Sequence, residues 1–500
     1  MTENVTAATT KRRESFVADS LASGLVIMLL MTLVQRGIGF FRGIWLCRLL
    51  DDTVVGQWSM ALGFITMLTP LMMLGFSGAM PRFVERYRLA GQLPKFLSRV
   101  LLGTLVGSVL VMSSLLLAPE TVGWIIFREA SSSRLLFSVG VAVLATLVFN
   151  FVMELVSSLR QVRTASSMQF LQGVGFTVIG LGILYAGGGL GDLILSYSLS
   201  TMIAILPGAR LLYRDWSGLP SSEEDFNSGQ MWRSLLPYAA ALWMMNLLTN
   251  SFELADRYMI LHFVSGGEEA ATAAVGQYHS GRLIPMLVTS LATMFSGVLM
   301  PYLTADWEAG KFEAVQQRLS WALFGLSLAF TACAAITIGA SPLFFETLLQ
   351  GRYADGLAIQ PMAFTFCIWA ATVTVAQNYL WIRERGALMG WSLAAGLIVN
   401  LVLNYWWLPT DGLHGAVAAT LVANAVVMLG TGFTLVRIGY EFDTTLIWVA
   451  ALPLTLLTDW RIALATSIAA ILLHRQAQQW TLEAWQAVRF KLPNVSADAT

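Results

Sequence analysis

Charged residues are scarce in this 500-residue chain, at 12% of the sequence, with 30 basic and 30 acidic side chains. A soluble chain of this length carries about twice that fraction, so a single large soluble domain is excluded. The zero net charge gives no basic surplus for binding nucleic acid. Cysteine is also rare, and Cys47, Cys333 and Cys367 lie too far apart for a disulfide framework or a metal-binding spacing.

The sequence also lacks the patterns of several enzyme classes. It has no glycine-rich phosphate loop of the nucleotide-hydrolase kind, so ATP hydrolysis is not encoded in it. The segments between apolar stretches are short and hold no carboxylate–histidine cluster suited to general acid–base work. We therefore predict no catalytic residues, no cofactor and no metal site.

Hydrophobic residues make up 56% of the chain, and the mean hydropathy is +0.66. Apolar windows of about 20 residues, the length needed to cross a bilayer, recur along nearly the whole sequence. We expect spans at 21–46, 57–80, 98–118, 135–158, 168–186, 190–212, 234–262, 276–300, 318–340, 357–381, 387–407 and 414–436. A pair at 444–458 and 461–474 is only marginally long enough. The pattern predicts an all-α polytopic membrane protein with 12 core helices, or 14 with the last pair.

An internal repeat links the two halves of the chain. Gly56-Gln57-Trp58 reappears as Gly276-Gln277-Tyr278, and Met80-Pro81 reappears as Met300-Pro301, both with an offset of 220 residues. Phe41-Arg42 lines up with Asp256-Arg257 at an offset of 215, if the loop before Gly276 is five residues longer. A duplicated membrane bundle is a common plan of transporters.

The positive residues indicate the orientation, because arginine and lysine accumulate on the cytoplasmic side. With the N-terminus inside, the inner segments hold 21 of them and the outer loops five. Six helices in each half then make the repeat parallel, about an axis along the membrane normal. The predicted parts are a cytosolic tail (1–19), a six-helix lobe (20–213), a cytosolic linker (214–231), a second lobe (232–438), a helical hairpin (439–475) and a cytosolic tail (476–500).

The residues that carry the repeat also carry a family resemblance over roughly residues 20 to 440. The stretches are Asp256 to Ile260, Gly276-Gln277-Tyr278, Met300-Pro301, Gly351-Arg352-Tyr353 and Pro409 to Ala416. Together they resemble polysaccharide flippases of the multidrug/oligosaccharidyl-lipid/polysaccharide exporter superfamily. The resemblance implies translocation of an oligosaccharide on polyprenyl diphosphate across a bacterial inner membrane. Partners would be that lipid-linked substrate, membrane lipids, and a polysaccharide polymerase or other assembly proteins.

Arginines in the first span are candidates for holding a diphosphate. Gln35, Gly39 and Arg42 share one face of the helix, and Arg36 lies beside them. Guanidinium groups suit phosphate oxygens and stay charged, whereas a charge near mid-bilayer is costly without a partner or a wet cavity. The alternative for Arg42 is that it lies near the outer end of the span and extends to the headgroups.

The seventh span carries a polar stripe of Asn246, Asn250, Glu253 and Arg257, with Asp256 just beside it. Glu253 and Arg257 are spaced as an i,i+4 ion pair, and such a pair fixing helix packing is one interpretation. The other is that the stripe lines a central cavity, where Asn250 and Arg257 contact the substrate. Glu253 or Asp256 would then titrate or bind a cation during transport.

The eighth span has its own polar seam, in which His279 and Arg282 lie on one face. Both are candidates for the same cavity, although an intramembrane histidine is also often hydrogen-bonded between helices. The basic segment Pro81 to Arg99 is expected to lie along the cytoplasmic headgroups.

Two rival functions remain open. A polytopic membrane enzyme of glycan assembly would be expected to carry a soluble domain or a long loop with acid and base residues. An ion-coupled multidrug exporter of the same superfamily would need a cavity centred on carboxylates. The arginines of the first span favour an anionic substrate instead.

Overall fold

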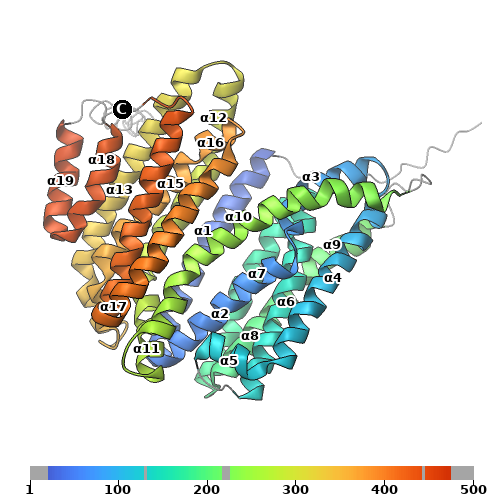
Figure 1. Cartoon of the computed structure of the whole chain (residues 1–500), viewed down its shortest axis with the longest axis horizontal. Coiled ribbons are helices and arrows are strands. Elements are labelled where there is room, and N and C mark those ends of the chain that lie inside the picture. Colours follow the sequence, from blue (N-terminus) through green and yellow to red (C-terminus); the bar gives the residue numbers. More distant parts are fainter. Residues whose placement is uncertain (1–20, 129–131, 217–225, 442–444, 474–500) are drawn as a thin grey trace, which may run out of the picture. The chain divides into compact units, whose positions relative to one another are not determined.

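A computed structural model describes residues 21–128, 132–216, 226–441 and 445–473, and Figure 1 shows that these residues form helices. No strand occurs among them. The predicted tails at 1–19 and 476–500, and most of the acidic part of the predicted linker, lie outside the described residues. Contacts divide the chain into two compact units, residues Met1–His279 and Ser280–Thr500.

The first unit is built around α6 (Ser133–Ser158), α7 (Val162–Tyr185) and α8 (Leu190–Ala204). α7 packs against α8 and α1, while α6 packs against α8, α2 and α3. The other helices are α1 (Leu21–Leu49), α2 (Asp52–Met72), α3 (Phe76–Leu89), α4 (Leu93–Leu117), α5 (Pro119–Phe127), α9 (Leu206–Trp216), α10 (Ser228–Phe263) and α11 (Glu268–Arg282).

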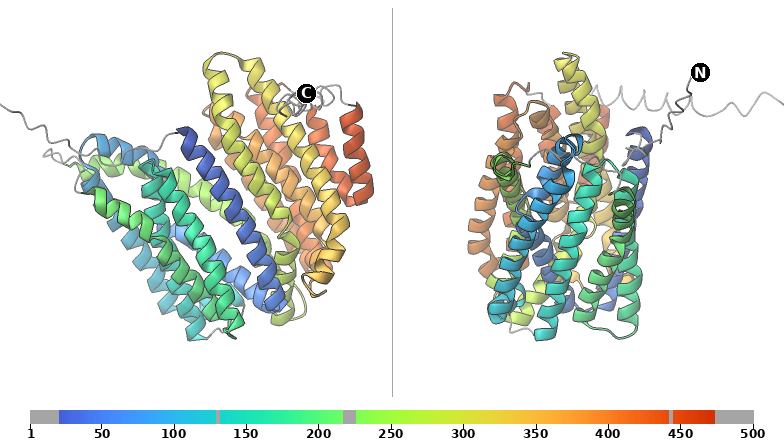
Figure 2. Two further views of the ribbon diagram at one scale, coloured as in Figure 1. Left: turned by 180° about the vertical axis from the view of Figure 1, so that it is seen from behind. Right: turned by 90° about the vertical axis from the view of Figure 1, so that its right-hand side faces the viewer.

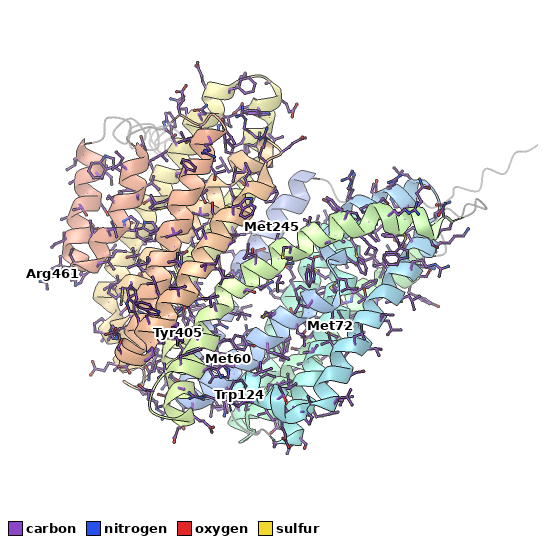
Figure 3. The ribbon with its side chains drawn as sticks, viewed as in Figure 1. Met60, Met72, Trp124, Met245, Tyr405 and Arg461 are labelled. Carbon is purple, nitrogen blue, oxygen red and sulfur yellow. The ribbon has the colours of Figure 1, made fainter. Side chains whose placement is uncertain are left out.

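Helix α10 belongs to the first unit because it packs against α2 and α3. Its end is tied to α5, where Arg128 donates to the Leu261 carbonyl oxygen over 2.8 Å. Trp124 lies on α5 (Figure 3), and its ring centroid is 4.6 Å from that of His262. The lobes predicted from sequence meet at the linker 214–231, whereas the contact boundary falls within α11. The lobe boundaries stay a prediction.

The second unit consists of α12 (Pro285–Glu308), α13 (Phe312–Thr347), α14 (Ala354–Ala358), α15 (Gln360–Ala376), α16 (Asn378–Ile382), η1 (Gly386–Leu388), α17 (Met389–Arg437), α18 (Thr445–Ala451), η2 (Leu452–Leu457) and α19 (Trp460–Leu473). α15 is its centre and packs against α12, α13, α17 and η2. α18, η2 and α19 correspond to the predicted terminal hairpin, and they pack on α13 (Figure 2).

Every predicted span corresponds to helix, but several boundaries were wrong. The sixth span divides into α8 and α9, and the tenth divides into α15 and α16. α2 ends at Met72 because Leu74 and Gly75 adopt positive φ angles of 49° and 75°, which break the helix. The predicted eighth span is two helices, since α12 begins at Pro285, and proline favours the first turn of a helix. The eleventh and twelfth spans run together as α17, kinked at Gly412 with φ 55°.

By length and composition, eight of the described helices can cross a membrane. Exposed apolar side chains cover their outer faces: on α4, Leu101, Leu105, Val109 and Leu110 are each more than half exposed. An apolar stripe of this kind suits contact with lipid. The exact count of 12 or 14 spans stays a prediction.

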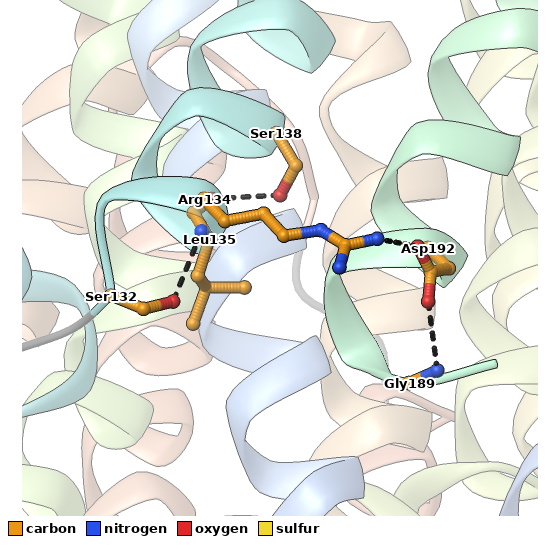
Figure 4. Close-up of polar contacts among 6 residues, drawn as sticks. All are labelled: Ser132, Arg134, Leu135, Ser138, Gly189 and Asp192. Atoms are coloured by element: carbon orange, nitrogen blue, oxygen red, sulfur yellow. Dashed lines mark hydrogen bonds and ion pairs between the residues drawn. The ribbon is translucent and has the colours of Figure 1, made fainter.

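One end of α6 is joined to α8 by a small polar cluster (Figure 4). Arg134 lies 2.8 Å from the Asp192 carboxylate, which also accepts from the Gly189 backbone amide over 3.1 Å. Ser132 caps α6 by accepting from the Leu135 amide. The Arg134–Asp192 pair holds the first turn of α8 against the first turn of α6.

The opposite end of the unit carries an ion pair on α3. Arg88 binds both oxygens of Glu85 at 3.0 Å, and Arg160 lies 3.8 Å away. The hydrogen bonds from Arg88 lower the pKa of Glu85. A carboxyl with a lowered folded-state pKa stabilises the fold above its unfolded pKa, and that contribution disappears as the pH falls through the folded pKa.

We therefore expect Glu85→Gln to lower stability by about 0.5 kcal/mol at neutral pH, the scale of partly exposed pairs. The difference from wild type should vanish in acid, where Glu85 is protonated in both states. Thermal unfolding in detergent at pH 7 and along a series of decreasing acid pH measures it, because the difference disappears only below the lowered folded-state pKa. A difference that persists unchanged in acid contradicts the assignment.

Candidate functional site

The repeated glycines meet where α2 crosses α11. A Cβ on Gly56 would lie 2.0 Å from the Thr272 carbonyl oxygen, and one on Gly276 would lie 1.9 Å from that of Asp52. The contact is reciprocal, because residues 52 and 272 are separated by the same 220 positions as 56 and 276. Only glycine permits backbones to approach this closely. The internal repeat therefore corresponds to a symmetric helix crossing.

Polar contacts flank the glycine crossing. Gln277 donates to the Asp52 carboxylate over 3.0 Å. One turn along each helix, Ser59 Oγ lies 3.3 Å from His279 Nδ1, and these two positions are again 220 apart. Hydrogen bonds between polar side chains are a common means of joining membrane helices. His279, predicted from sequence as a cavity residue, is therefore bonded to α2.

Helix α10 brings a buried carboxylate and a buried guanidinium to the same place. Asp256 is 2% exposed and accepts a short hydrogen bond from the hydroxyl of Tyr278 on α11. Arg257 is 8% exposed and donates to the Ser59 carbonyl oxygen over 3.4 Å. Ser59 thus contacts both Arg257 and His279. We call Ser59, Asp256, Arg257, Tyr278 and His279 the α2–α10–α11 cluster.

Removing the Tyr278 hydroxyl is expected to destabilise the protein by about 1–3 kcal/mol, because a buried carboxylate then loses a donor. Thermal unfolding of Tyr278→Phe in detergent measures this loss. Tyr302→Phe is the matched control, since Tyr302 is 60% exposed and is expected to change little. Equal stability of Tyr278→Phe and wild type would show that the Asp256 contact contributes nothing.

The polar residues of α1 bind α7 instead. Arg42 Nη1 donates to the Gly173 carbonyl oxygen over 3.2 Å, and its guanidinium lies 4.7 Å from the centroid of the Phe176 ring. Gln35 donates to the Gln169 carbonyl oxygen over 3.3 Å. Arg36 is exposed. The two arginines therefore differ: Arg42 is hydrogen-bonded to α7, and Arg36 is exposed.

The Phe176 ring, which contacts Arg42, also contacts an aromatic side chain of α2. The ring centroid of Phe176 is 5.2 Å from that of Trp58 on α2, the residue before Ser59. Tyr197 of α8 completes the group, 5.4 Å from Phe176. Trp58 stands where the second repeat has Tyr278. The same repeat position thus packs on rings in one copy and binds a carboxylate in the other.

The rest of the α10 stripe is more open. Asn250 Nδ2 donates to both Asn246 oxygens at 2.9 Å. Glu253 is exposed, and no hydrogen bond or ion pair joins it to Arg257 within the described parts of the chain. The expected i,i+4 pair is therefore not formed, because the Arg257 guanidinium turns towards Ser59.

Arg282 falls in the second unit. It is 8% exposed, and its guanidinium lies 5.5 Å from the centroid of the Phe366 ring on α15. Its predicted companion His279 is the last residue of the first unit. The structure thus brings Arg257, Asp256 and His279 together, and describes Arg36, Arg42 and Arg282 in other surroundings.

Sequence reasoning missed Ser59 and Tyr278 as members of the cluster. The offset of 220 makes Ser59 equivalent to His279 and Tyr278 equivalent to Trp58. Aligning the two copies residue by residue would therefore have marked Ser59 and Tyr278 as candidate members. The Tyr278–Asp256 contact has no such signal, because it joins two helices of the same copy.

Comparison with known proteins defines the class. The fold is similar to "Lipid II flippase MurJ, inward closed conformation", with a TM-score of 0.67 and 14% identity, covering 90% of this chain and 97% of that one. It is also similar to an outward-facing multidrug resistance MATE family transporter of the MOP superfamily, with a TM-score of 0.57 and 15% identity over 84% of this chain and 94% of that one. The chain therefore shares its fold with these two solved structures.

The chain belongs to the family described as "Polysaccharide biosynthesis protein", whose model matches residues 21–306. It is 23% identical over 209 residues to an uncharacterized membrane protein, YabM, of Bacillus subtilis (strain 168). That alignment covers 41% of this chain and 39% of the relative's length. The resemblance inferred from the repeat residues is thereby confirmed.

Proposed function

We propose that this protein flips a lipid-linked oligosaccharide, carried on polyprenyl diphosphate, across a bacterial inner membrane for surface polysaccharide export. The family match carries the proposal, because it covers more than half of the chain and is described by polysaccharide biosynthesis. The similarity to a lipid II flippase adds support, since that protein's substrate is also a lipid. The N-terminus faces the cytoplasm in this proposal.

The proposed mechanism is alternating access of two lobes around a cationic site. The diphosphate is held by charge-assisted hydrogen bonds from four arginines, Arg36, Arg42, Arg257 and Arg282. The sugar or the phosphate is contacted by His279 and Asn250. The glycan crosses in water, and the lipid tail stays in the bilayer. Polysaccharide assembly proteins would supply the substrate and receive it.

An ion gradient drives the cycle through Glu253 or Asp256 in this proposal. Asp256 is buried and hydrogen-bonded to Tyr278, whereas Glu253 is exposed and joined to no side chain among the described residues. The open carboxylate is therefore the better candidate for exchanging a cation, and Asp256 is the better candidate for holding α10 to α11.

Export of a drug is the second candidate function, favoured by the similarity to multidrug transporters. Deleting the gene and complementing it separates the two. The flippase proposal predicts that the deletion accumulates lipid-linked oligosaccharide on the cytoplasmic leaflet and leaves sensitivity to cationic drugs unchanged. Normal surface glycan together with drug sensitivity would support the exporter instead.

A further inference from the structure

A basic pocket of the first unit lies between the start of α7 and α9. These two helices pack together. Its cavity has a volume of about 490 Å³. Arg163, Thr164 and Ser167 line it from α7, and Arg210 and Arg214 line it from α9. It shares no residue with the α2–α10–α11 cluster.

The charge of this pocket favours an anion. Three exposed arginines line it, and Arg214 pairs with Asp215, whose carboxylate lies 2.6 Å from Arg214 Nε. Arg210 makes no hydrogen bond or ion pair within the described residues. Guanidinium groups bind phosphate oxygens through paired N–H donors, and the threonine and serine hydroxyls can add further donors.

The other side of the pocket is apolar and open. Leu171, Ile203 and Leu206 line it and are exposed, Leu206 at 63%. The pocket lies at the ends of two candidate membrane spans, Val162–Tyr185 and Leu190–Trp216. Tyr213 and Trp216 of α9 are also exposed, and such aromatics are enriched at the level of lipid headgroups. A ligand here would meet charge at one end and hydrocarbon at the other.

We propose that this pocket binds the headgroup of an anionic phospholipid of the cytoplasmic leaflet. The phosphate contacts Arg163 and Arg210, and the acyl chains lie along Leu171, Ile203 and Leu206. The cytoplasmic side follows from the distribution of arginine and lysine in the sequence. Basic pockets between transmembrane helices are known binding places for anionic headgroups. The proposal is independent of what the protein transports.

Native mass spectrometry of the full-length protein in detergent, titrated with phosphatidylglycerol, tests this site. Arg163→Gln/Arg210→Gln is expected to weaken binding about 25-fold, a factor of about five for each arginine near a membrane surface. Arg210→Gln alone should lose about fivefold, and it keeps the fold intact because its side chain holds no other group. Arg99→Gln is the matched control, an exposed arginine of α4 outside the pocket.

Three further ligands identify the source of the phosphate. Phosphatidylcholine should bind more weakly than phosphatidylglycerol, and inorganic phosphate should not displace the lipid. Unchanged binding of phosphatidylglycerol to Arg210→Gln, or an equal loss in Arg99→Gln, would overturn the proposal. So would tighter binding of a polyprenyl diphosphate through these arginines, because the pocket would then be a substrate site.

Discussion

Replacing Gly276 with alanine is expected to destabilise the protein by about 3 kcal/mol, the upper range for overpacking, and to abolish glycan export. The added methyl would lie 1.9 Å from the Asp52 carbonyl oxygen, so α2 and α11 must separate. The same two helices are joined by two hydrogen bonds, Gln277–Asp52 and Ser59–His279, and both would lengthen as the helices separate. Thermal unfolding in detergent and surface glycan in cells measure the two effects.

Gly297→Ala provides the matched control. Gly297 lies on α12, and a Cβ there would meet nothing within 4 Å. Alanine at such a helical position is expected to stabilise by about 0.5–1 kcal/mol. Gly56→Ala should behave like Gly276→Ala, because the contact is reciprocal. If Gly276→Ala unfolds at the same temperature as Gly297→Ala, the two helices do not approach each other as described.

Replacing Arg257 with glutamine is expected to reduce export about 30-fold, since a charge-assisted hydrogen bond contributes about 2 kcal/mol. The proposal assigns this guanidinium to the diphosphate, while the structure shows it donating to Ser59. The two roles differ in their effect on stability. Loss of export with unchanged thermal unfolding supports contact with the diphosphate, whereas an equal loss of stability supports a structural bond to Ser59.

Arg134→Gln is the control for Arg257→Gln. Arg134 pairs with Asp192 at an exposed end of α6 and lies outside the candidate site, so glycan export should stay near the wild-type level. Surface glycan is compared at equal protein amounts in the membrane. Wild-type export by Arg257→Gln would remove Arg257 from the substrate site.

Most of the fold was predictable because each span is an apolar run, and helix is the structure that satisfies its backbone within a bilayer. The breaks were less predictable. The end of α2 depends on positive φ angles at Leu74 and Gly75, and a Cβ on Gly75 would lie 2.1 Å from the Ala239 carbonyl oxygen. That close approach is a tertiary contact with α10, and a hydropathy pattern contains no information about such contacts. In contrast, the break before α12 follows from Pro285 itself.

The candidate site was predictable only in part. Helical spacing identified Arg257 and His279 but wrongly paired Glu253 with Arg257, because spacing along one helix ignores acceptors on its neighbours. Ser59 of α2 is such an acceptor. The contacts of Arg42 could not be predicted from spacing along α1 either, because Gly173 and Phe176 belong to α7. The internal repeat was the better guide, because it related residues on different helices.

Flipping by the purified protein in liposomes tests the central proposal most directly. The probe is a polyprenyl diphosphate oligosaccharide with a fluorescent sugar, and a membrane-impermeant reductant destroys fluorophores on the outer leaflet. The flippase proposal predicts that all of the fluorescence is lost in liposomes with the protein and only the outer-leaflet part in empty ones. With Arg257→Gln the inner-leaflet part should be lost about 30-fold more slowly. Equal loss in liposomes with and without the wild-type protein would contradict it.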